Sequence, residues 1–257
     1  IMKGLITLLL FTVICSFGIS QTVPNGGFEE WTPSGAFSNP TEWATSNVTV
    51  TFVTIEAVEQ SSDSHSGDYA ARLETVSPPM SSNAAPGLVT LGDFNLDIVA
   101  QSGDVSGGIP WESRPMSLTG HYKFTPVDGD HAFIGLGFFK FNESTQLSDT
   151  IGEAILIIEE LAEDWTEFVL DVEWHSNETP DSMNIIVMSS DGRFTPKVGT
   201  TLYVDSFEFI FQDPNAPTFN DFGPYCQGSV ADELPLMSNN DIEGFWNPEE
   251  INTEMPG

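Results

Sequence analysis

Basic residues are scarce in this sequence. Lysine and arginine together number seven, against 38 aspartates and glutamates, so the formal net charge at pH 7 is −31. Nucleic-acid binding needs a basic patch that neutralises phosphates, and an anionic membrane surface repels a chain of this charge. Both partner classes are therefore disfavoured. Acidic residues mostly solubilise a surface, but some of these carboxylates can also bind calcium, which takes about six to eight oxygen ligands.

Cysteine is equally scarce, with Cys15 and Cys226 in the whole chain. Cys15 lies within residues 1–20, where a lysine, the apolar run Leu5–Ile14 and a small-residue site ending at Ser20 indicate a secretory signal peptide. The apolar run is too short to anchor the chain in a bilayer. The sequence thus predicts cleavage after Ser20, no membrane insertion afterwards, and a secreted or extracellular cell-surface protein.

Long helical periodicity is absent as well. Between residues 21 and 212, short alternating or apolar segments are separated by Gly, Pro, Asn, Asp and Ser. Many short strands with turn residues between them indicate an all-β domain, an antiparallel β-sandwich of jelly-roll type. Residues 153–163 could alternatively form a helical turn. The predicted strands are Val48–Ile55, Tyr69–Thr75, Leu88–Leu91, Ser117–Phe124, Ala132–Phe141, Ala154–Glu159, Glu167–Trp174, Met183–Met188 and Leu202–Phe211.

Alternation within the predicted strands assigns their faces. In the segment Glu167–Trp174, every second residue from Phe168 on is apolar, and the positions between them are acidic except for Val169. Such a strand buries one face between two sheets and leaves the other in water. We therefore expect Phe168, Leu170, Val172 and Trp174 to share the buried face.

Catalytic motifs are missing. The four histidines, His65, His121, His131 and His175, lack the spacing of a metal-binding HExxH motif, and no GxSxG nucleophile turn occurs. With 38 acidic residues, some carboxylate pair lies at glycosidase distance by chance, so such a pair is uninformative. The sequence makes an enzyme the less favoured alternative, and no catalytic residue is assigned.

Several motifs follow one another in a specific order along residues 25–211. They are Asn25-Gly26-Gly27-Phe28-Glu29, Trp43, His65-Ser66-Gly67-Asp68-Tyr69, Gly108-Ile109-Pro110-Trp111-Glu112-Ser113-Arg114-Pro115 and Leu202-Tyr203-Val204-Asp205. This order resembles the carbohydrate-metabolism (PCMD) domain, a jelly-roll family of secreted proteins, and both ends are similar to calcium-binding carbohydrate-binding modules. The resemblance implies a jelly roll, and glycan binding by analogy.

The resemblance also implies a structural calcium ion. It assigns Glu29 and Asp205 as side-chain ligands, with backbone oxygens near Gly67 and Asp68 completing the shell. Hard oxygen donors and two carboxylates suit calcium. Glu30 is a rival to Glu29, because the sequence alone does not fix which carboxylate faces the site. The alternative is a solvent-facing glutamate and an aspartate that caps a turn.

Sugar recognition needs an aromatic ring that stacks on a pyranose and polar groups that bind its hydroxyls. Trp111 lies in a Gly/Pro-rich loop, which makes it the predicted platform, with Arg114 as hydroxyl donor and Trp43 as a further candidate. The alternative is that Trp111 folds back over the core and Arg114 pairs with a surface carboxylate.

The C-terminal part differs in character. Residues 213–222 are predicted to be a linker, and residues 223–257 contain Cys226 and the motif Gly244-Phe245-Trp246-Asn247-Pro248. This segment resembles the start of the cysteine-containing Ig-like repeats of large secreted bacterial surface proteins. Those repeats supply a second cysteine further on, so we expect a truncated repeat. A free buried thiol is the alternative.

Together these features predict non-catalytic binding of a polysaccharide or glycoconjugate by an exported jelly-roll module with a structural calcium ion. Neighbouring Ig-like modules of the same longer chain are the expected protein partners. Two alternatives stay open at this point: a glycoside-active enzyme, and a structural adhesin or stalk domain of a cell-surface protein.

Overall fold

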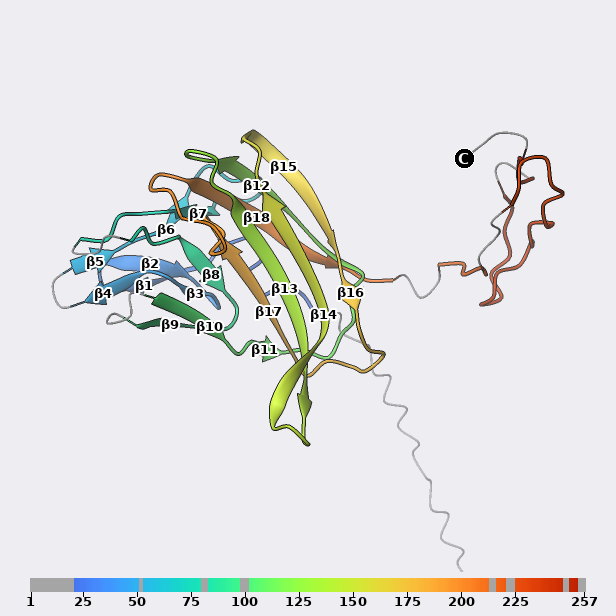
Figure 1. The fold of residues 1–257 in the computed structure, drawn as a ribbon, viewed down its shortest axis with the longest axis horizontal. Coiled ribbons are helices and arrows are strands. Elements are labelled where there is room, and N and C mark those ends of the chain that lie inside the picture. Colours follow the sequence, from blue (N-terminus) through green and yellow to red (C-terminus); the bar gives the residue numbers. More distant parts are fainter. Residues whose placement is uncertain are drawn as a thin grey trace, which may run out of the picture. The chain divides into compact units, whose positions relative to one another are not determined.

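The computed structural model describes residues 21–50, 53–79, 83–97, 102–212, 216–220, 225–246 and 250–253. The predicted signal peptide, residues 1–20, lies outside this part of the chain. The chain divides into two compact units, Ile1–Phe209 and Ile210–Gly257, which are described separately (Figure 1). No helix in the described residues is long and apolar enough to cross a membrane.

The first unit is built around two antiparallel sheets. The seven-stranded sheet comprises, in spatial order, β16 (Glu173–Trp174), β14 (Leu147–Ile158), β13 (Ala132–Asn142), β17 (Ser182–Met188), β8 (Leu88–Thr90) and β3 (Ala44–Thr45), with β11 (Ile109–Pro110) pairing with β17. The five-stranded sheet comprises β15 (Ala162–Asp171), β12 (Ser117–Thr125), β18 (Thr201–Ile210), β7 (Ala70–Glu74) and β6 (Val58–Ser61).

Three two-stranded hairpins complete this unit. They are β1 (Trp31–Ser34) with β2 (Phe37–Pro40), β4 (Val48–Val50) with β5 (Val53–Ile55), and β9 (Asp93–Asp97) with β10 (Ser102–Ser106). The described residues contain no helix, which confirms the predicted all-β sandwich of jelly-roll type.

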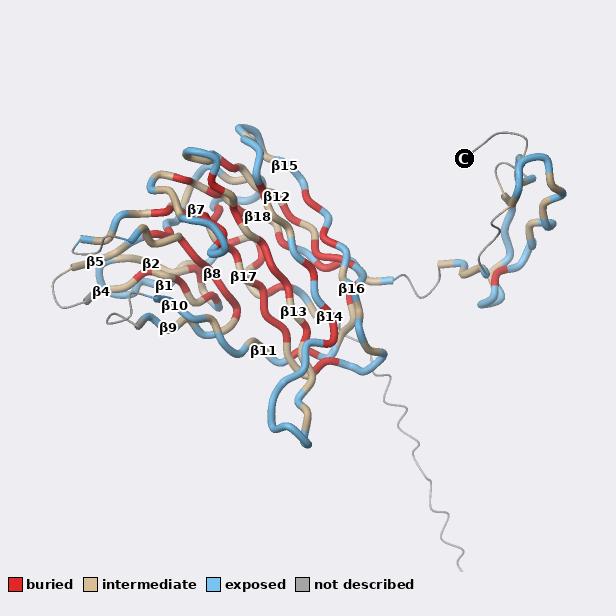
Figure 2. Tube along the Cα trace, in the orientation of Figure 1, coloured by how far each residue is buried: buried red, intermediate tan, exposed pale blue. Residues whose placement is uncertain are grey.

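The core lies between the two sheets, because alternate residues of the long strands point inward. Figure 2 shows buried segments along β13. In β13, Ile134 and Phe138 are buried, and in β18 Phe209 is buried. The Phe138 and Phe209 ring centroids are 6.1 Å apart, so side chains of the two sheets touch directly. The residues that alternate with these core positions therefore point outward.

Three expectations about strands are corrected. Val48–Ile55 was predicted to be one strand, but it contains β4 and β5, which pair with each other. Residues 153–163 form no helical turn, because β14 runs to Ile158 and β15 starts at Ala162. The predicted strand Glu167–Trp174 is two strands: β15 belongs to the five-stranded sheet, and β16 pairs with β14 in the seven-stranded sheet. Phe168 and Leu170 are buried as expected, but Trp174 is on a different sheet.

The second unit contains little buried surface. A short hairpin is closed by the bridge between Met237 and Glu243. The Asn240 side chain accepts a hydrogen bond from the Thr218 backbone N–H at 3.0 Å, so the side chain joins two segments of this unit. Cys226 is exposed and free. Residues 213–215 and 221–224 lie outside the described part of the chain, so the linker and the Ig-like repeat remain predictions.

Candidate functional site

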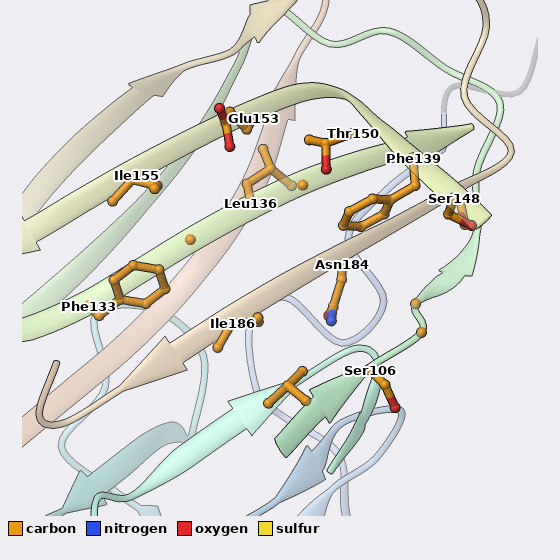
Figure 3. Close-up of a pocket in the computed structure, with 16 residues that line it drawn as sticks. Ser106, Phe133, Leu136, Phe139, Ser148, Thr150, Glu153, Ile155, Asn184 and Ile186 are labelled. Atoms are coloured by element: carbon orange, nitrogen blue, oxygen red, sulfur yellow. The ribbon is translucent and has the colours of Figure 1, made fainter. Parts of the chain in front are cut away.

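The outer face of the seven-stranded sheet carries a groove of about 530 Å³. Its floor comes from β13, β14 and β17, and residues 105–108, at the end of β10 and just after it, line one side (Figure 3). A volume of this size suits a small-molecule or oligomeric ligand. The groove is thus the candidate binding site of the first unit.

Two aromatic rings lie on the groove floor. Phe133 and Phe139 are outward-facing residues of β13, with Gly135 and Gly137 between them on the same face. A Cβ atom added at Gly135 would lie 2.5 Å from the Phe133 ring, and one added at Gly137 would lie 2.7 Å from the Phe139 ring. Each ring therefore lies over a glycine, and any larger residue at either position would displace the ring from the floor.

Polar groups surround these rings. Ser148, Thr150 and Glu153 of β14 and Asn184 of β17 line the groove (Figure 3). The Asn184 Oδ1 atom accepts hydrogen bonds from Thr90 Oγ1 at 2.7 Å and from the Gly92 backbone N–H at 2.9 Å, which fixes the amide. The arrangement suits a ligand that has flat apolar faces and several hydroxyl groups.

Glu153 is the one carboxylate among the described residues that line the groove. Its Oε1 atom lies 3.2 Å from His175 Nε2, and both side chains are well exposed. A glycosidase ordinarily places two carboxylates across the scissile bond, about 5 to 10 Å apart. The described lining supplies one member of such a pair.

Trp111 does not form the predicted platform. Its side chain is 1% exposed, and its ring centroid lies 4.9 Å from that of Phe209. The indole N–H donates to the Ser113 carbonyl at 2.8 Å. A ring enclosed in the core has no free face for a sugar, so the stacking assignment is corrected. The alternative, in which Trp111 folds back onto the core, describes the structure.

Trp43 and Arg114 also have structural partners. Trp43 is 4% exposed, contacts Phe28 at 5.1 Å between ring centroids, and donates its indole N–H to the Pro24 carbonyl at 3.0 Å. The Arg114 guanidinium lies 3.8 Å from the Trp174 ring centroid and donates to backbone carbonyls, including that of Ser176. The expected surface carboxylate is not its partner, and none of these residues lines the groove.

The sequence motifs did not predict the groove, because its signal is the glycine and phenylalanine content of one strand rather than a loop motif. The run Phe133-Ile134-Gly135-Leu136-Gly137-Phe138-Phe139 places two glycines between two phenylalanines on one face of the strand. Glycine inside a strand often marks a place where another group approaches the backbone closely. That signal could have directed attention to β13.

A second site lies at the start of the unit, where the N-terminal turn meets β18. The Phe207 backbone N–H donates to the Gly26 carbonyl at 2.8 Å, so the first segment lies beside the last strand, as the motif order implied. A Cβ atom at Gly26 would overlap the Phe207 carbonyl. This position therefore needs glycine.

The Glu29 and Asp205 side chains bind opposite ends of the loop of residues 64–69. Asp205 Oδ2 accepts hydrogen bonds from the backbone N–H groups of His65 at 2.8 Å and Ser66 at 3.0 Å. The Glu29 carboxylate accepts from the Asp68 N–H at 3.0 Å and the Tyr69 N–H at 3.3 Å. Both carboxylates assigned to the metal thus face one loop.

Glu30 occupies a different position. Its side chain is exposed, and its backbone N–H donates to Asn25 Oδ1 at 3.1 Å. The Gly67 carbonyl, one of the backbone oxygens assigned to the metal, accepts a hydrogen bond from Ser64 Oγ at 3.3 Å. Of the two rival carboxylates, Glu29 is the one that contacts the loop.

The Asp205 carboxylate has one uncompensated oxygen. The residue is fully buried, and Oδ1 has no hydrogen-bond partner. Burial lowers the pKa of nearby His121, and charge repulsion from His65, whose stacked ring lies 3.4 Å away between centroids, lowers it further against the opposing effect of Glu167 and Asp205. A buried, unpartnered carboxylate oxygen is costly, and a cation beside it would offset that cost.

The candidate metal donors are few. Among the residues that the structure describes, no group of three or more His, Cys, Asp or Glu side chains converges to hold a metal ion. A cation here would therefore need the two carboxylates together with backbone oxygens. Oxygen-only ligation of this kind fits calcium and does not suit zinc, which prefers nitrogen and sulfur.

Gly67 is expected to be essential to this turn. Its φ is +65°, and a Cβ atom would overlap the Glu29 carboxylate. Gly67→Ala should therefore destabilise the protein by about 2 kcal/mol or more, which lowers Tm by roughly 4–8 °C in a domain of this size. Thermal unfolding followed by circular dichroism measures the change.

Gly35→Ala is the matched control. Gly35 also has a positive φ, +71°, but nothing lies within 4 Å of its added Cβ atom. This variant carries the backbone strain without the overlap, so it should lose about half as much stability or less. An equal loss in the two variants would show that Glu29 does not press against residue 67.

No known family model matches the chain, and no curated protein matches it. The resemblance to the PCMD domain is therefore not confirmed by a family match. The chain does resemble solved structures of other proteins.

One is a proposed glycoside hydrolase from Bacteroides thetaiotaomicron VPI-5482, 20% identical, with a TM-score of 0.51 over 62% of this chain and 57% of that protein. A second proposed glycoside hydrolase, from Bacteroides vulgatus ATCC 8482, is 17% identical, with a TM-score of 0.52 over 72% and 96%. A third is CBM28, a carbohydrate-binding module specific for non-crystalline cellulose, 12% identical, with a TM-score of 0.39 over 74% and 95%. The chain spans little more than half of the first of these proteins. At such identities the likeness concerns the fold.

Proposed function

We propose that this protein is a non-catalytic carbohydrate-binding module and that the groove on the seven-stranded sheet holds its polysaccharide or glycoconjugate ligand. The observation that carries this proposal is the pair of rings, Phe133 and Phe139, laid over glycines on the groove floor. Aromatic rings stack on the apolar faces of pyranoses, while nearby hydroxyl, amide and carboxylate groups bind sugar hydroxyls. The groove combines both kinds of group.

The fold supports the same ligand class. The two Bacteroides proteins with TM-scores above 0.5 are described as proposed glycoside hydrolases. A jelly roll alone fixes no function, so the groove residues carry the argument. An open groove with aromatic rings also speaks against a purely structural stalk, whose sheet face would be filled by its own side chains.

The charge of the chain narrows the ligand. With a net charge of −31 and Glu153 in the groove, an anionic glycan would be repelled. We therefore propose a neutral polysaccharide. The test is affinity gel electrophoresis of the purified protein in gels that contain neutral or anionic polysaccharides. Retardation by a neutral glycan is expected, and retention by anionic glycans alone would contradict the proposal.

Glu153 separates the binding role from the enzymatic alternative. Glu153→Gln keeps an oxygen acceptor in the groove and should weaken binding by only about fivefold, the loss of one charge-assisted hydrogen bond. A hydrolase that used Glu153 would instead lose all product formation. Affinity and release of shorter sugars are measured for both proteins; product from the wild type that disappears in the variant would establish an enzyme.

We also propose a structural calcium ion held by the Glu29 and Asp205 side chains and by backbone oxygens near Gly67 and Asp68. The unpartnered Asp205 Oδ1 supports this assignment. Calcium would supply positive charge between two carboxylates that face one loop. The residues themselves tie the N-terminal turn and β18 to the loop of residues 64–69, and this link stabilises the sandwich.

The biological setting remains a proposal from sequence motifs. Export through residues 1–20, a location outside the cell, membership of the PCMD domain family and a following Ig-like repeat belong to it. Linked modules on one chain would raise a weak glycan affinity through effective concentration. Secretion of a reporter fused after residue 20 would test the export step.

A further inference from the structure

The hairpin formed by the ends of β13 and β14 extends past the seven-stranded sheet (Figure 1). The pairing of β13 with its neighbour β17 ends at Phe139, opposite Ser182. Beyond that point β13 pairs with β14 alone, through Lys140 opposite Asp149, Phe141 opposite Ser148 and Asn142 opposite Leu147. We call residues 139–150 the hairpin arm.

One face of the hairpin arm continues the groove floor. Phe139 and Phe141 are two residues apart in β13, so their side chains point to the same side of the strand. Ser148, directly opposite Phe141, lines the groove, as does Thr150, opposite Phe139. Phe141 thus faces the same side as the groove residues, and its side chain is 46% exposed.

The hairpin arm is anchored to the sheet next to this ring. The Phe141 backbone N–H donates to Asp181 Oδ2 at 2.8 Å, and the Asp181 backbone N–H donates to the Phe139 carbonyl at 3.0 Å. These two bonds fix the strand on both sides of Lys140. A ring on an anchored strand costs less conformational entropy on binding than one on a loose loop.

We propose that Phe141 is an additional sugar platform, which extends the groove onto the hairpin arm and makes its ligand an extended neutral polysaccharide chain rather than a single or terminal sugar. This inference rests on the proposed function. Phe133 and Phe141 are eight residues apart in one strand, a distance of roughly 26 Å between their Cα atoms. A chain of several sugar units could contact all three rings along β13.

The test is chain-length dependence of affinity. Isothermal titration measures binding of neutral linear oligosaccharides, from the cello-, xylo-, manno- and laminari- series, with two to eight units. Phe141→Ala should weaken binding of the longest bound members by about tenfold, because it removes one stacked ring. The shortest bound members should be unaffected, since they do not reach the hairpin arm.

Leu147→Ala is the matched control. Leu147 is 67% exposed and lies near the tip of the same hairpin arm, on the face opposite that of Ser148. Leu147→Ala should leave the affinity unchanged for oligosaccharides of every length. If Phe141→Ala weakens binding of oligosaccharides of every length equally, or of none, the inference is overturned. Glycan binding by the wild type would in that case still support the groove. If the wild type binds no glycan of any length, the proposed function itself fails.

Discussion

Alanine at both Phe133 and Phe139 is expected to lower glycan affinity by about 100-fold, because each lost ring removes about 1.5 kcal/mol of stacking and apolar burial. Both rings are half-buried at the surface of the seven-stranded sheet, so the core beneath them stays intact. The double variant should therefore fold normally and fail to bind. Affinity electrophoresis in a gel that contains the retained polysaccharide measures the loss.

Phe245→Ala is the control for this double variant. Phe245 belongs to the second unit, is 91% exposed and does not line the groove. The same chemical change there should leave retention unaltered. If the double variant is retained like the wild type while its thermal unfolding is unchanged, the groove is not the glycan site.

The second large effect concerns calcium. Calcium at about 100 times its Kd is expected to stabilise the native protein by about 2.7 kcal/mol, which raises Tm by roughly 5–10 °C over the value in chelator. Asp205→Asn should abolish most of this rise. The amide still offers an oxygen to the His65 and Ser66 N–H groups but brings no negative charge to a cation. Differential scanning calorimetry with calcium and with chelator measures both values.

Glu29→Gln and Glu30→Gln form a neighbouring pair for the same experiment. Both residues are exposed, but only the Glu29 carboxylate is seen to accept hydrogen bonds from the loop of the candidate site. The first substitution should reduce the calcium-dependent rise in Tm, and the second should leave it unchanged. Identical melting of the wild type in calcium and in chelator would contradict a bound calcium ion altogether.

The sequence predicted the sandwich well because its long strands are strongly patterned. Residues 132–141, 183–188 and 202–211 were expected to be strands, and the structure has β13, β17 and β18 there. Short pairs such as β1 with β2 and β9 with β10 were not foreseen. Their four or five residues carry too little alternation, and tertiary contacts decide whether such segments pair.

The Glu29 and Asp205 carboxylates contact one loop, and a metal ion shared by them stays a prediction, whereas the predicted sugar platform is buried. Glu29 and Asp205 belong to motifs at the two ends of the first unit. The sandwich places those ends side by side, since the Phe207 N–H donates to the Gly26 carbonyl. Trp111 was judged by its Gly/Pro-rich loop, which says nothing about the direction of the ring. The loop folds back, and Phe209 covers that ring. Side-chain direction in a loop depends on packing that local sequence does not encode.

The most direct test of the central claim is a screen of the purified protein against a broad array of glycans, with the incubated glycans then analysed for shorter sugars. The groove account predicts retention of a neutral polysaccharide by the wild type, loss of retention in the Phe133→Ala/Phe139→Ala variant, and no shortened product. Silence across the whole array would contradict a carbohydrate-binding module, and release of shorter sugars would show that the protein is an enzyme.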